Sequence, residues 1–408
     1  MKTTMRKIHY AWYVCFGCAL LLFCTSGLTI NAFTVYQPFI ISQNGFSNTQ
    51  TSTIITVRSL FAFISMFLTG IYYKKISLRK GMCLAGFLIT AGFLLFGIAK
   101  TYLIYCIGAV CIGFGYGFGT MVPIAIMLEH WFIQKRTLAI SICSAVTGLS
   151  TLGIPTLITK AIERFGLRTT FIAEAVLICV FTLISFCLVR DTPEEKHILP
   201  YGETTENIPK EQTAGTTAIQ KKHWLFLVPM LLLIGAMTNV AYSHLAVLVS
   251  AEGYASELTA LAISVSGVSL MLSKCLFGWT TEKIGAYKSN TIFGIILILG
   301  MVLCCFSGIH EGIMLIAMCL YGFGLALTTV GLTTWVGDLC TGEEYDKTVR
   351  FFQLGYAAGC FVFSSLPGIL ADRFGGSYIP AYIFFVFCTI YVICTIQWVY
   401  KSTGNKPS

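Results

Sequence analysis

Two basic residues stand inside long apolar stretches of this chain, and the chemistry they offer is anion binding. Lys274 lies in the apolar stretch that begins at Leu258, and Arg58 lies within the segment 56–60. A charge at membrane depth costs roughly 3 kcal/mol on insertion scales, so we expect neither side chain to face lipid. Two alternatives stay open: Lys274 could reach the nearby cytoplasmic surface, and Arg58 could be a structural donor to carbonyls at a span end.

Small residues share the helical face of each cation. At helical spacing these residues lie on one stripe, which is therefore suited to packing on protein or water. For Lys274 they are Ser266, Gly267 and Gly278, and for Arg58 they are Thr51, Ala62, Ser65 and Thr69. Because Glu174 is the sole acid that the pattern places at mid-membrane, a positive interior that selects anions is predicted.

The composition indicates a membrane protein. Of 408 residues, 56% are hydrophobic and 11% are charged, which excludes an ordinary soluble domain. Cys15 and Cys18 have a redox spacing but no His or acidic neighbour, so packing explains them better. We find no nucleophile–base pair and no metal spacing, so the sequence predicts a protein that is not an enzyme, with no cofactor or metal.

The elements that must position the two cations are membrane-spanning helices. Apolar runs predict an all-α membrane protein with twelve transmembrane helices. The expected spans are 10–40, 47–73, 79–99, 102–129, 136–160, 168–189, 223–250, 256–280, 289–309, 312–337, 347–371 and 378–400. A polar stretch that contains Pro193, Pro200 and Pro209 separates the sixth span from the seventh and predicts a flexible linker.

Lys and Arg predict the orientation. With the amino terminus in the cytoplasm, 20 of the 27 basic residues fall in cytoplasmic segments and 5 in outer loops, leaving Arg58 and Lys274 within spans. This asymmetry favours two cytoplasmic termini. It also accounts for the net charge of +9 without a nucleic-acid partner.

Three short motifs recur at nearly one offset. Residues 163–166 and 372–375 share acid-Arg-Phe-Gly, and residues 113–115 and 322–324 share Gly-Phe-Gly, both 209 positions apart; the segments 70–77 and 278–285 match at an offset of 208. Such duplication indicates two parallel six-span repeats with a site between them. The predicted domains are 1–189, a cytoplasmic linker 190–222, and 223–408.

The chain resembles the major facilitator superfamily over nearly its whole length. The resemblance rests on the twelve spans, the central linker and the inner-loop signature after spans two and eight. Its second copy matches well, whereas the first has Lys74 and Ser77 where the family usually has Asp and Gly. The signature residues expected to act as a structural or gating loop are Gly70, Lys75, Gly278, Glu282, Lys283 and Gly285.

Within that superfamily the chain is most similar to the monocarboxylate-transporter and oxalate/formate-antiporter branch. The similar features are Trp12, the alternating glycines of 113–119, the segment 131–139, and Lys274, at whose position relatives carry an Arg that meets the substrate carboxylate. The lysine keeps the charge and loses the bidentate fork. Leu270 stands where monocarboxylate carriers hold a coupling Asp, and span eleven has no internal cation. The coupling ion therefore stays open.

The resemblance implies that spans one, four, seven and ten line a central cavity, with spans two, five, eight and eleven beside them. Polar residues at mid-depth are the lining candidates, although each alone is equally compatible with packing. They are Asn31, Tyr116, Thr120, Asn239, Tyr242, Thr328, Gln353 and Tyr356. His244 is compatible with a proton-linked gate or with an interfacial position.

These features together favour a secondary active transporter of a small organic anion, with a monocarboxylate as the expected substrate, in the cytoplasmic membrane of a prokaryote. We expect a monomer in the lipid bilayer that works by alternating access. One alternative is an exporter of amphipathic compounds, favoured by 14% aromatic residues. A less favoured alternative is a non-transporting membrane sensor. The central linker is too short to form the output domain that a sensor needs.

Overall fold

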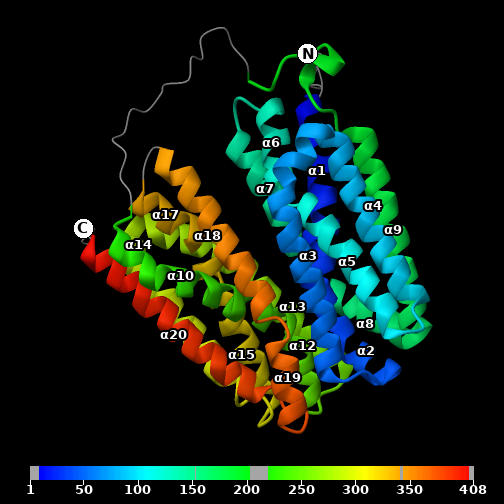
Figure 1. The fold of residues 1–408 in the computed structure, drawn as a ribbon, viewed down its shortest axis with the longest axis vertical. Helices are drawn as coiled ribbons and strands as arrows, with labels where there is room; N and C mark the ends of the chain where they lie inside the picture. The colour runs from blue at the N-terminus through cyan, green and yellow to red at the C-terminus, as the bar shows by residue number, and fades with distance from the viewer. Residues whose placement is uncertain (1–8, 152, 203–218, 341–342, 404–408) are drawn as a thin grey trace, which may run out of the picture. The chain divides into compact units, whose positions relative to one another are not determined.

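Backbone hydrogen bonding dictates the secondary structure. A bilayer core holds no water for N–H and C=O groups, so a spanning segment must satisfy them internally as a helix. The computed structural model describes residues 9–151, 153–202, 219–340 and 343–403, which are helical almost throughout (Figure 1). Among them, eleven helical stretches are long and apolar enough to cross a membrane. The predicted all-α membrane fold is confirmed.

The described helices gather in two compact units, and each is treated by itself. The first unit takes the described residues of Met1–Asn31, Ile64–Ser150 and Arg168–Lys210, and the second takes those of Ala32–Phe63, Thr151–Leu167 and Glu211–Ser408. The division into six-helix bundles 1–189 and 223–408 with a linker 190–222 stays a prediction.

Helices of the first unit correspond mainly to the first six expected spans. They are α1 (Tyr10–Leu22), a π-helical segment η1 (Phe23–Ala32), the later part of α3 (Asn48–Lys75), α4 (Leu78–Ile98), α5 (Tyr102–Phe118), α6 (Met121–Trp131), α7 (Arg136–Leu149), α9 (Leu167–Leu188) and η3 (Pro193–Lys196).

The second unit contains the remaining helices. They are η2 (Phe33–Val35), α2 (Tyr36–Asn44), the earlier part of α3, α8 (Ile154–Phe165), α10 (Lys221–Gly235), the π-helical segment η4 (Ala236–Val240), α11 (Ala241–Ser243), α12 (Leu245–Ala251), α13 (Ser256–Ile284), α14 (Ala286–Cys304), α15 (Glu311–Gly324), α16 (Ala326–Thr329), α17 (Gly331–Leu339), α18 (Glu343–Val362), α19 (Leu366–Arg373) and α20 (Ile379–Ser402).

The expected fifth span is divided between α7 and α8. Gly153 precedes α8 with φ 74°, a left-handed conformation that favours glycine because it has no Cβ. Pro155, in the first turn of α8, has no N–H to continue a preceding helix. The apolar run 136–160 is therefore two helices rather than one, which an apolarity count does not detect.

Spans one and seven share a π-helical interruption at equivalent places. Gly27 and Asn31 in η1 are matched by Gly235 and Asn239 around η4, at an offset of 208. A π-helical turn carries one extra residue, disturbs the regular hydrogen bonding and is often found at functional sites. Both interruptions therefore place an asparagine on an irregular turn.

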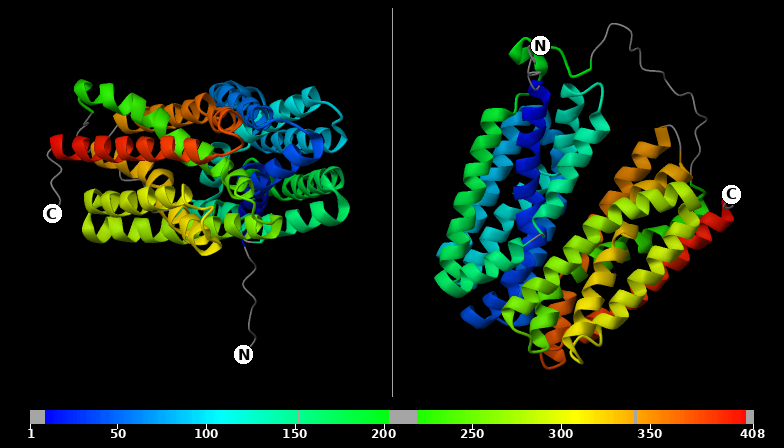
Figure 2. Two further views of the ribbon diagram at one scale, coloured as in Figure 1. Left: turned by 90° about the horizontal axis from the view of Figure 1, so that it is seen from below. Right: turned by 180° about the vertical axis from the view of Figure 1, so that it is seen from behind.

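The repeated Gly-Phe-Gly motif serves close helix packing within each unit. In the first unit, a Cβ on Gly115 would collide with the Ala85 carbonyl and Ile89 of α4. In the second, a Cβ on Gly322 would collide with the Ser266 carbonyl of α13, and one on Gly324 with Leu297 of α14. Glycines let helix backbones approach closely, and Figure 2 shows the yellow-green helices α13 and α14 beside the yellow helix α15.

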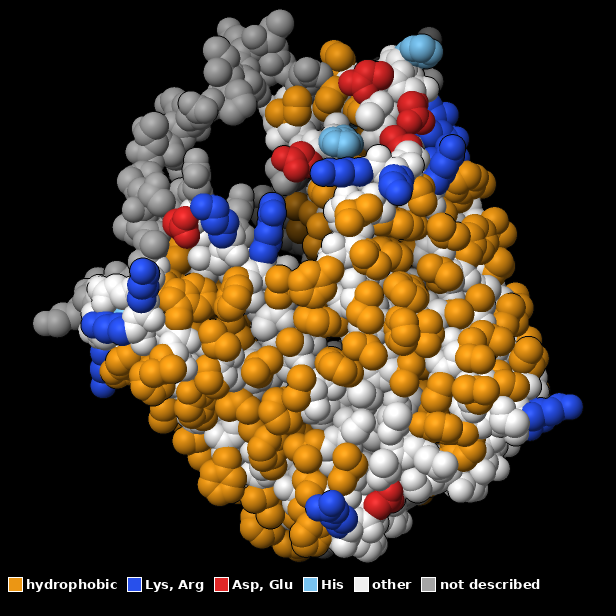
Figure 3. Space-filling view, viewed as in Figure 1, with side chains coloured by type: hydrophobic (Ala, Val, Ile, Leu, Met, Phe, Trp, Pro, Cys, Tyr) orange, Lys and Arg blue, Asp and Glu red, His pale blue; other side chains and the backbone are white. Residues whose placement is uncertain are grey.

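Large apolar side chains cover the outward faces of both units (Figure 3). On α9, for example, Val176 and Leu183 are 55% and 48% exposed, and on α20 Phe387 is 66% exposed. Soluble proteins rarely expose apolar area on this scale, so these faces are suited to contact lipid. Lys and Arg instead gather toward helix ends in the face shown.

The predicted linker begins with an ordered section. Tyr201 pairs with the first unit: its N–H donates to the Trp131 carbonyl at 2.9 Å, and its ring contacts those of Trp12 and Phe132 with centroids 5.9 and 5.7 Å away. The flexible-linker prediction is therefore wrong for residues 190–202. For residues 203–218 it lies outside the described residues.

Candidate substrate site

Arg58 is a buried cation of the second unit. It lies in the earlier part of α3, its side chain is 4% exposed, and its guanidinium carbon lies 5.3 Å from the centre of the Phe33 ring. Thr51, Ala62 and Ser65, on the same helical stripe, are buried as well. The ring face stabilises the charge by cation–π attraction, and the burial removes it from lipid.

A buried histidine lies near this cation. His244, between α11 and α12, has no exposed surface, and its Nε2 lies 3.0 Å from Oγ of Ser52 on α3. The other ring nitrogen, Nδ1, lies 2.9 Å from the Val240 carbonyl oxygen. Both ring nitrogens are thus bonded inside the second unit. The choice between a proton-linked gate and an interfacial position stays a prediction.

Lys274 is the second candidate cation for the site and lies on α13 of the same unit. Its side chain is half-buried, and Gly267 on the same stripe packs so closely on Thr151 that a Cβ there would collide with it. Lys274 precedes the end of α13 by ten residues, or about 15 Å of helix. Within the described chain its ammonium group has no hydrogen-bond or ion-pair partner. This ammonium group is therefore available to pair with a bound anion.

Two tyrosine hydroxyls bond the backbone around the π turn that carries Asn239. The buried hydroxyl of Tyr321 donates to the carbonyls of Met237 and Thr238 at 3.2 and 3.1 Å, and that of Tyr382 donates to Ala241 at 2.7 Å. These bonds add donors to carbonyls in and directly after the π turn, where the backbone hydrogen bonding is irregular. Asn239 itself is half-buried and has no amide partner among the described residues.

Sequence reasoning missed Tyr321 and Tyr382. A tyrosine inside an apolar span is the available signal, since a buried hydroxyl needs a partner. Their partners lie 83 or more positions away in sequence, however, so the pattern could not reveal which carbonyls they support.

Other candidates of the second unit differ in exposure. Tyr242 is 5% exposed beside Ser266, and Thr328 is 1% exposed and donates to the Leu325 carbonyl of its own helix at 3.0 Å. Gln353 is exposed and Tyr356 half-buried, and the Tyr356 backbone packs directly on Gly235 before the π turn. Thr328 therefore contributes packing in this arrangement, whereas Gln353 and Tyr356 are accessible.

Three candidates belong to the first unit. Asn31 donates from Nδ2 to the Thr147 carbonyl at 3.1 Å, which ties η1 to α7. Thr120 and Tyr116 are half-buried at the junction of α5 and α6, where the Thr25 hydroxyl of η1 donates to the Gly119 carbonyl at 2.8 Å. The structure thus brings spans one and four together in this unit.

The two copies of the loop signature form different turns. Gly285 has φ 83° between α13 and α14, a conformation that favours glycine. Ser77, at the corresponding place, has φ −60° and accepts the Lys80 N–H at 3.5 Å as the cap of α4. Serine therefore replaces glycine where a cap rather than a left-handed turn is needed.

The charged members of the signature are exposed. Lys75, Glu282 and Lys283 are exposed, as is Gly70, and Gly278 is half-buried. The ammonium group of Lys283 lies 4.3 Å from the centre of the Trp279 ring. Within the described residues this cation–π contact, not a pairing with Glu282, orders Lys283.

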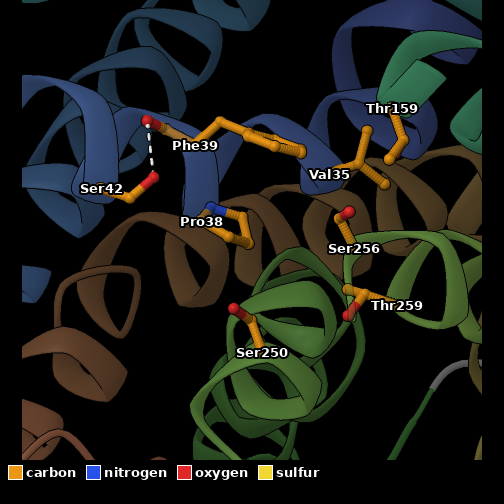
Figure 4. Close-up of a pocket in the computed structure, with 8 residues that line it drawn as sticks. All are labelled: Val35, Pro38, Phe39, Ser42, Thr159, Ser250, Ser256 and Thr259. Atoms are coloured by element: carbon orange, nitrogen blue, oxygen red, sulfur yellow. Dashed lines mark hydrogen bonds between the residues drawn. The ribbon is translucent and has the colours of Figure 1, made fainter. Parts of the chain in front are cut away.

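One cavity near the start of α13 is not an anion site. It measures about 140 Å³ and lies within the second unit, and Figure 4 shows the hydroxyls of Ser250, Ser256 and Thr259 around it. Its lining residues carry no charge. A buried carboxylate requires a charged or multiply donating partner, so the two cations are better candidates.

The described part of this chain is helical, with eleven stretches of spanning length, as in a polytopic membrane protein. A model of the Major Facilitator Superfamily matches residues 18–310 and 253–407. The chain belongs to the Major Facilitator Superfamily.

Relatives within this family carry names of several kinds. Monocarboxylate transporter 12 of Mus musculus is 21% identical over 94% of this chain and 84% of its own length. The oxalate:formate antiporter of Oxalobacter formigenes is 22% identical over 88% and 82%. The aspyridones efflux protein of Emericella nidulans is 22% identical over 90% and 73%.

Solved structures support the same fold. The nucleoside transporter NupG superposes with a TM-score of 0.72 over 97% of this chain and 100% of that chain, at 12% identity. A D-xylose-proton symporter superposes with a TM-score of 0.71 over 96% of each chain, at 13% identity. The major facilitator fold predicted from the sequence is therefore confirmed.

Proposed function

We propose that this protein is a secondary active transporter of a small organic anion, with a monocarboxylate as its substrate class. The observation that carries the proposal is Lys274, a half-buried cation on a spanning helix whose ammonium group has no acidic partner among the described residues. A carboxylate substrate would supply the missing charge. Relatives named as a monocarboxylate transporter and an oxalate:formate antiporter support this class.

Arg58 has a second role in this proposal. Its buried charge raises the positive potential of the interior and favours anions over cations. Asn239, Tyr242, Gln353 and Tyr356 would add hydrogen bonds. Asn31, Tyr116 and Thr120 stay candidates from the sequence. Alternating access would rock the six-span halves 1–189 and 223–408, joined by the segment 190–222. The inner gating loops would be formed by Gly70, Lys75, Gly278, Glu282, Lys283 and Gly285.

We further propose the cytoplasmic membrane of a prokaryote as the location, with a monomer as the working form and both termini in the cytoplasm. The asymmetry of Lys and Arg among the loops supports this orientation.

Substrate class is tested on the purified protein by thermal shift and by flux. A carboxylate that binds the folded state raises the midpoint of thermal unfolding by mass action. We expect a monocarboxylate to do so and to be taken up by proteoliposomes, across pH 5 to 8. Neutral and cationic compounds of similar size are the controls. A panel in which no carboxylate shifts the midpoint or enters vesicles contradicts the proposal.

An exporter of amphipathic compounds is the second candidate. The observations in its favour are the similarity to an aspyridones efflux protein and the 14% aromatic content. It predicts competition by apolar cations and none by carboxylates. A non-transporting sensor predicts binding without flux, and the short linker argues against it.

A further inference from the structure

Two acidic residues of a repeated motif have no part in the proposed substrate site. Glu163 lies in the last turn of α8 in Glu-Arg-Phe-Gly, and Asp372 lies in the last turn of α19 in Asp-Arg-Phe-Gly, 209 positions later. Both lie in the second unit and both side chains are exposed. An exposed acid contributes little to a core, so its repetition calls for another explanation.

Asp372 contacts the first residues of α3. Its Oδ1 accepts hydrogen bonds from the backbone N–H and from Nδ2 of Asn48 at 3.2 and 2.9 Å, and its Oδ2 accepts from the N–H of Thr49 at 2.8 Å. A carboxylate here also meets the positive end of the helix dipole. Residues 324 positions apart are thereby joined.

Helix α3 does not need this carboxylate to begin. Ser47 Oγ accepts the N–H of Gln50 at 3.1 Å, and Gln50 Oε1 accepts the N–H of Ser47 at 3.0 Å, which is a complete capping box. This cap does not bond the backbone N–H groups of Asn48 and Thr49. Asp372 accepts hydrogen bonds from both. Its contact therefore joins two helices rather than forming one.

Glu163 makes the corresponding contact with α13. Its carboxylate accepts a hydrogen bond from the hydroxyl of Ser256, the first residue of that helix. Ser256 follows Asn48 by 208 positions, so acid and helix start are both repeated. In Figure 4 Ser256 lies near Thr159 of α8, the helix that carries Glu163.

Further contacts surround the start of α3. The Tyr378 hydroxyl donates to Asn48 Oδ1 at 3.0 Å, and Thr56 Oγ1 lies 2.5 Å from Ser365 Oγ. Gly368 of α19 sits so close to α3 that a Cβ would collide with Ser52 and the Asn48 carbonyl. All of these join first-repeat residues to second-repeat residues, so they must separate whenever a carrier opens at this end.

We infer that Asp372 and Glu163 are matched positioning residues, which hold this end of the carrier closed by binding the first residues of α3 and α13. The inference rests on the proposed transport function, because only a carrier needs contacts that break in each cycle. Because both acids are exposed and bind only the first residues of a helix, the two contacts can break and reform without unfolding either helix.

Hydrogen exchange of the purified full-length protein tests the contacts without any substrate. Asp372→Asn removes the charge, and we expect amides within 46–56 to exchange about 3- to 10-fold faster. Glu163→Gln should instead accelerate amide exchange within 256–262. Gly368→Ala, which wedges α19 from α3, should reproduce the effect of Asp372→Asn, and Asp372→Glu should largely restore protection.

Glu311→Gln is the matched control, since it removes an exposed carboxylate from the first turn of α15. It should leave both segments unchanged. Unaltered exchange in Asp372→Asn and Gly368→Ala, or equal acceleration in every helix of the second unit, would overturn the inference.

Flux separates this inference from the proposed function. In proteoliposomes that take up a carboxylate, Asp372→Asn should change the maximal rate at least threefold with little change in KM, because the acid contacts no substrate. Changes in both exchange and maximal rate support the inference. Accelerated exchange without flux of any organic anion contradicts the transport proposal alone, whereas normal exchange with normal flux contradicts only the positioning role.

Discussion

Oγ of Ser52 lies 3.0 Å from Nε2 of His244, and neither side chain has exposed surface. Donation from Nδ1–H to the Val240 carbonyl at 2.9 Å leaves Nε2 as an acceptor for the serine hydroxyl. The early part of α3 is thus bonded to the junction of α11 and α12.

Removing either partner should destabilise the protein. We expect Ser52→Ala to lower the free energy of unfolding by about 1 kcal/mol and His244→Ala by about 2–3 kcal/mol, because each leaves a buried polar group unpaired. The double variant Ser52→Ala/His244→Ala should lose about 1 kcal/mol less unfolding free energy than the two single losses added together. The midpoint of thermal unfolding measures this, with the exposed Ser42→Ala as control. Strict additivity would contradict the bond.

Tyr321→Phe should destabilise the span-seven π turn. The change strips a donor from the Met237 and Thr238 carbonyls, which costs about 1–3 kcal/mol for buried groups. Tyr391→Phe, whose hydroxyl lies 3.4 Å from the Phe226 carbonyl, should cost less than about 0.5 kcal/mol. Both variants are compared by thermal unfolding. Equal midpoints would show that the π turn does not depend on Tyr321.

Lys274→Gln should lower carboxylate uptake by at least tenfold, since the substrate loses its charged partner. Lys274→Arg keeps the charge and should retain part of the activity. Lys288→Gln, which removes an exposed cation from the first turn of α14, should leave uptake near normal. Uptake is normalised to protein in proteoliposomes. Full uptake by Lys274→Gln would remove Lys274 from the site.

Gly153→Ala should cost about 1 kcal/mol although the position is open. No atom lies within 4 Å of a Cβ there, so the cost is that of a left-handed φ of 74° alone. Gly70 is equally open but lies in an ordinary turn of α3, so Gly70→Ala should be neutral or stabilising by up to about 1 kcal/mol. The midpoints of thermal unfolding of Gly153→Ala and Gly70→Ala measure these changes. Equal changes in the two midpoints would contradict the argument that the left-handed φ causes the cost.

Part of the candidate site could be anticipated from local pattern. The stripe of small residues around Arg58 predicted burial, and its side chain is 4% exposed. Asn31 and Asn239 were chosen for polarity at mid-depth, and both lie on π-helical turns. Thr328 met the same criterion yet bonds only to its own helix, because a hydroxyl in a span can always donate to a carbonyl one turn back. Whether these residues bind substrate stays a prediction.

The sequence by itself determined the helical membrane fold, the family and the duplicated plan, because apolar run length and repeated spacing are local properties that a bilayer converts directly into helices. It also exposed the acid-Arg-Phe-Gly repeat, but not its role. Only the tertiary structure decided that Asp372 meets Asn48 and that Tyr321 supports the π turn. Contacts between distant residues follow from how helices pack, and no local pattern encodes them.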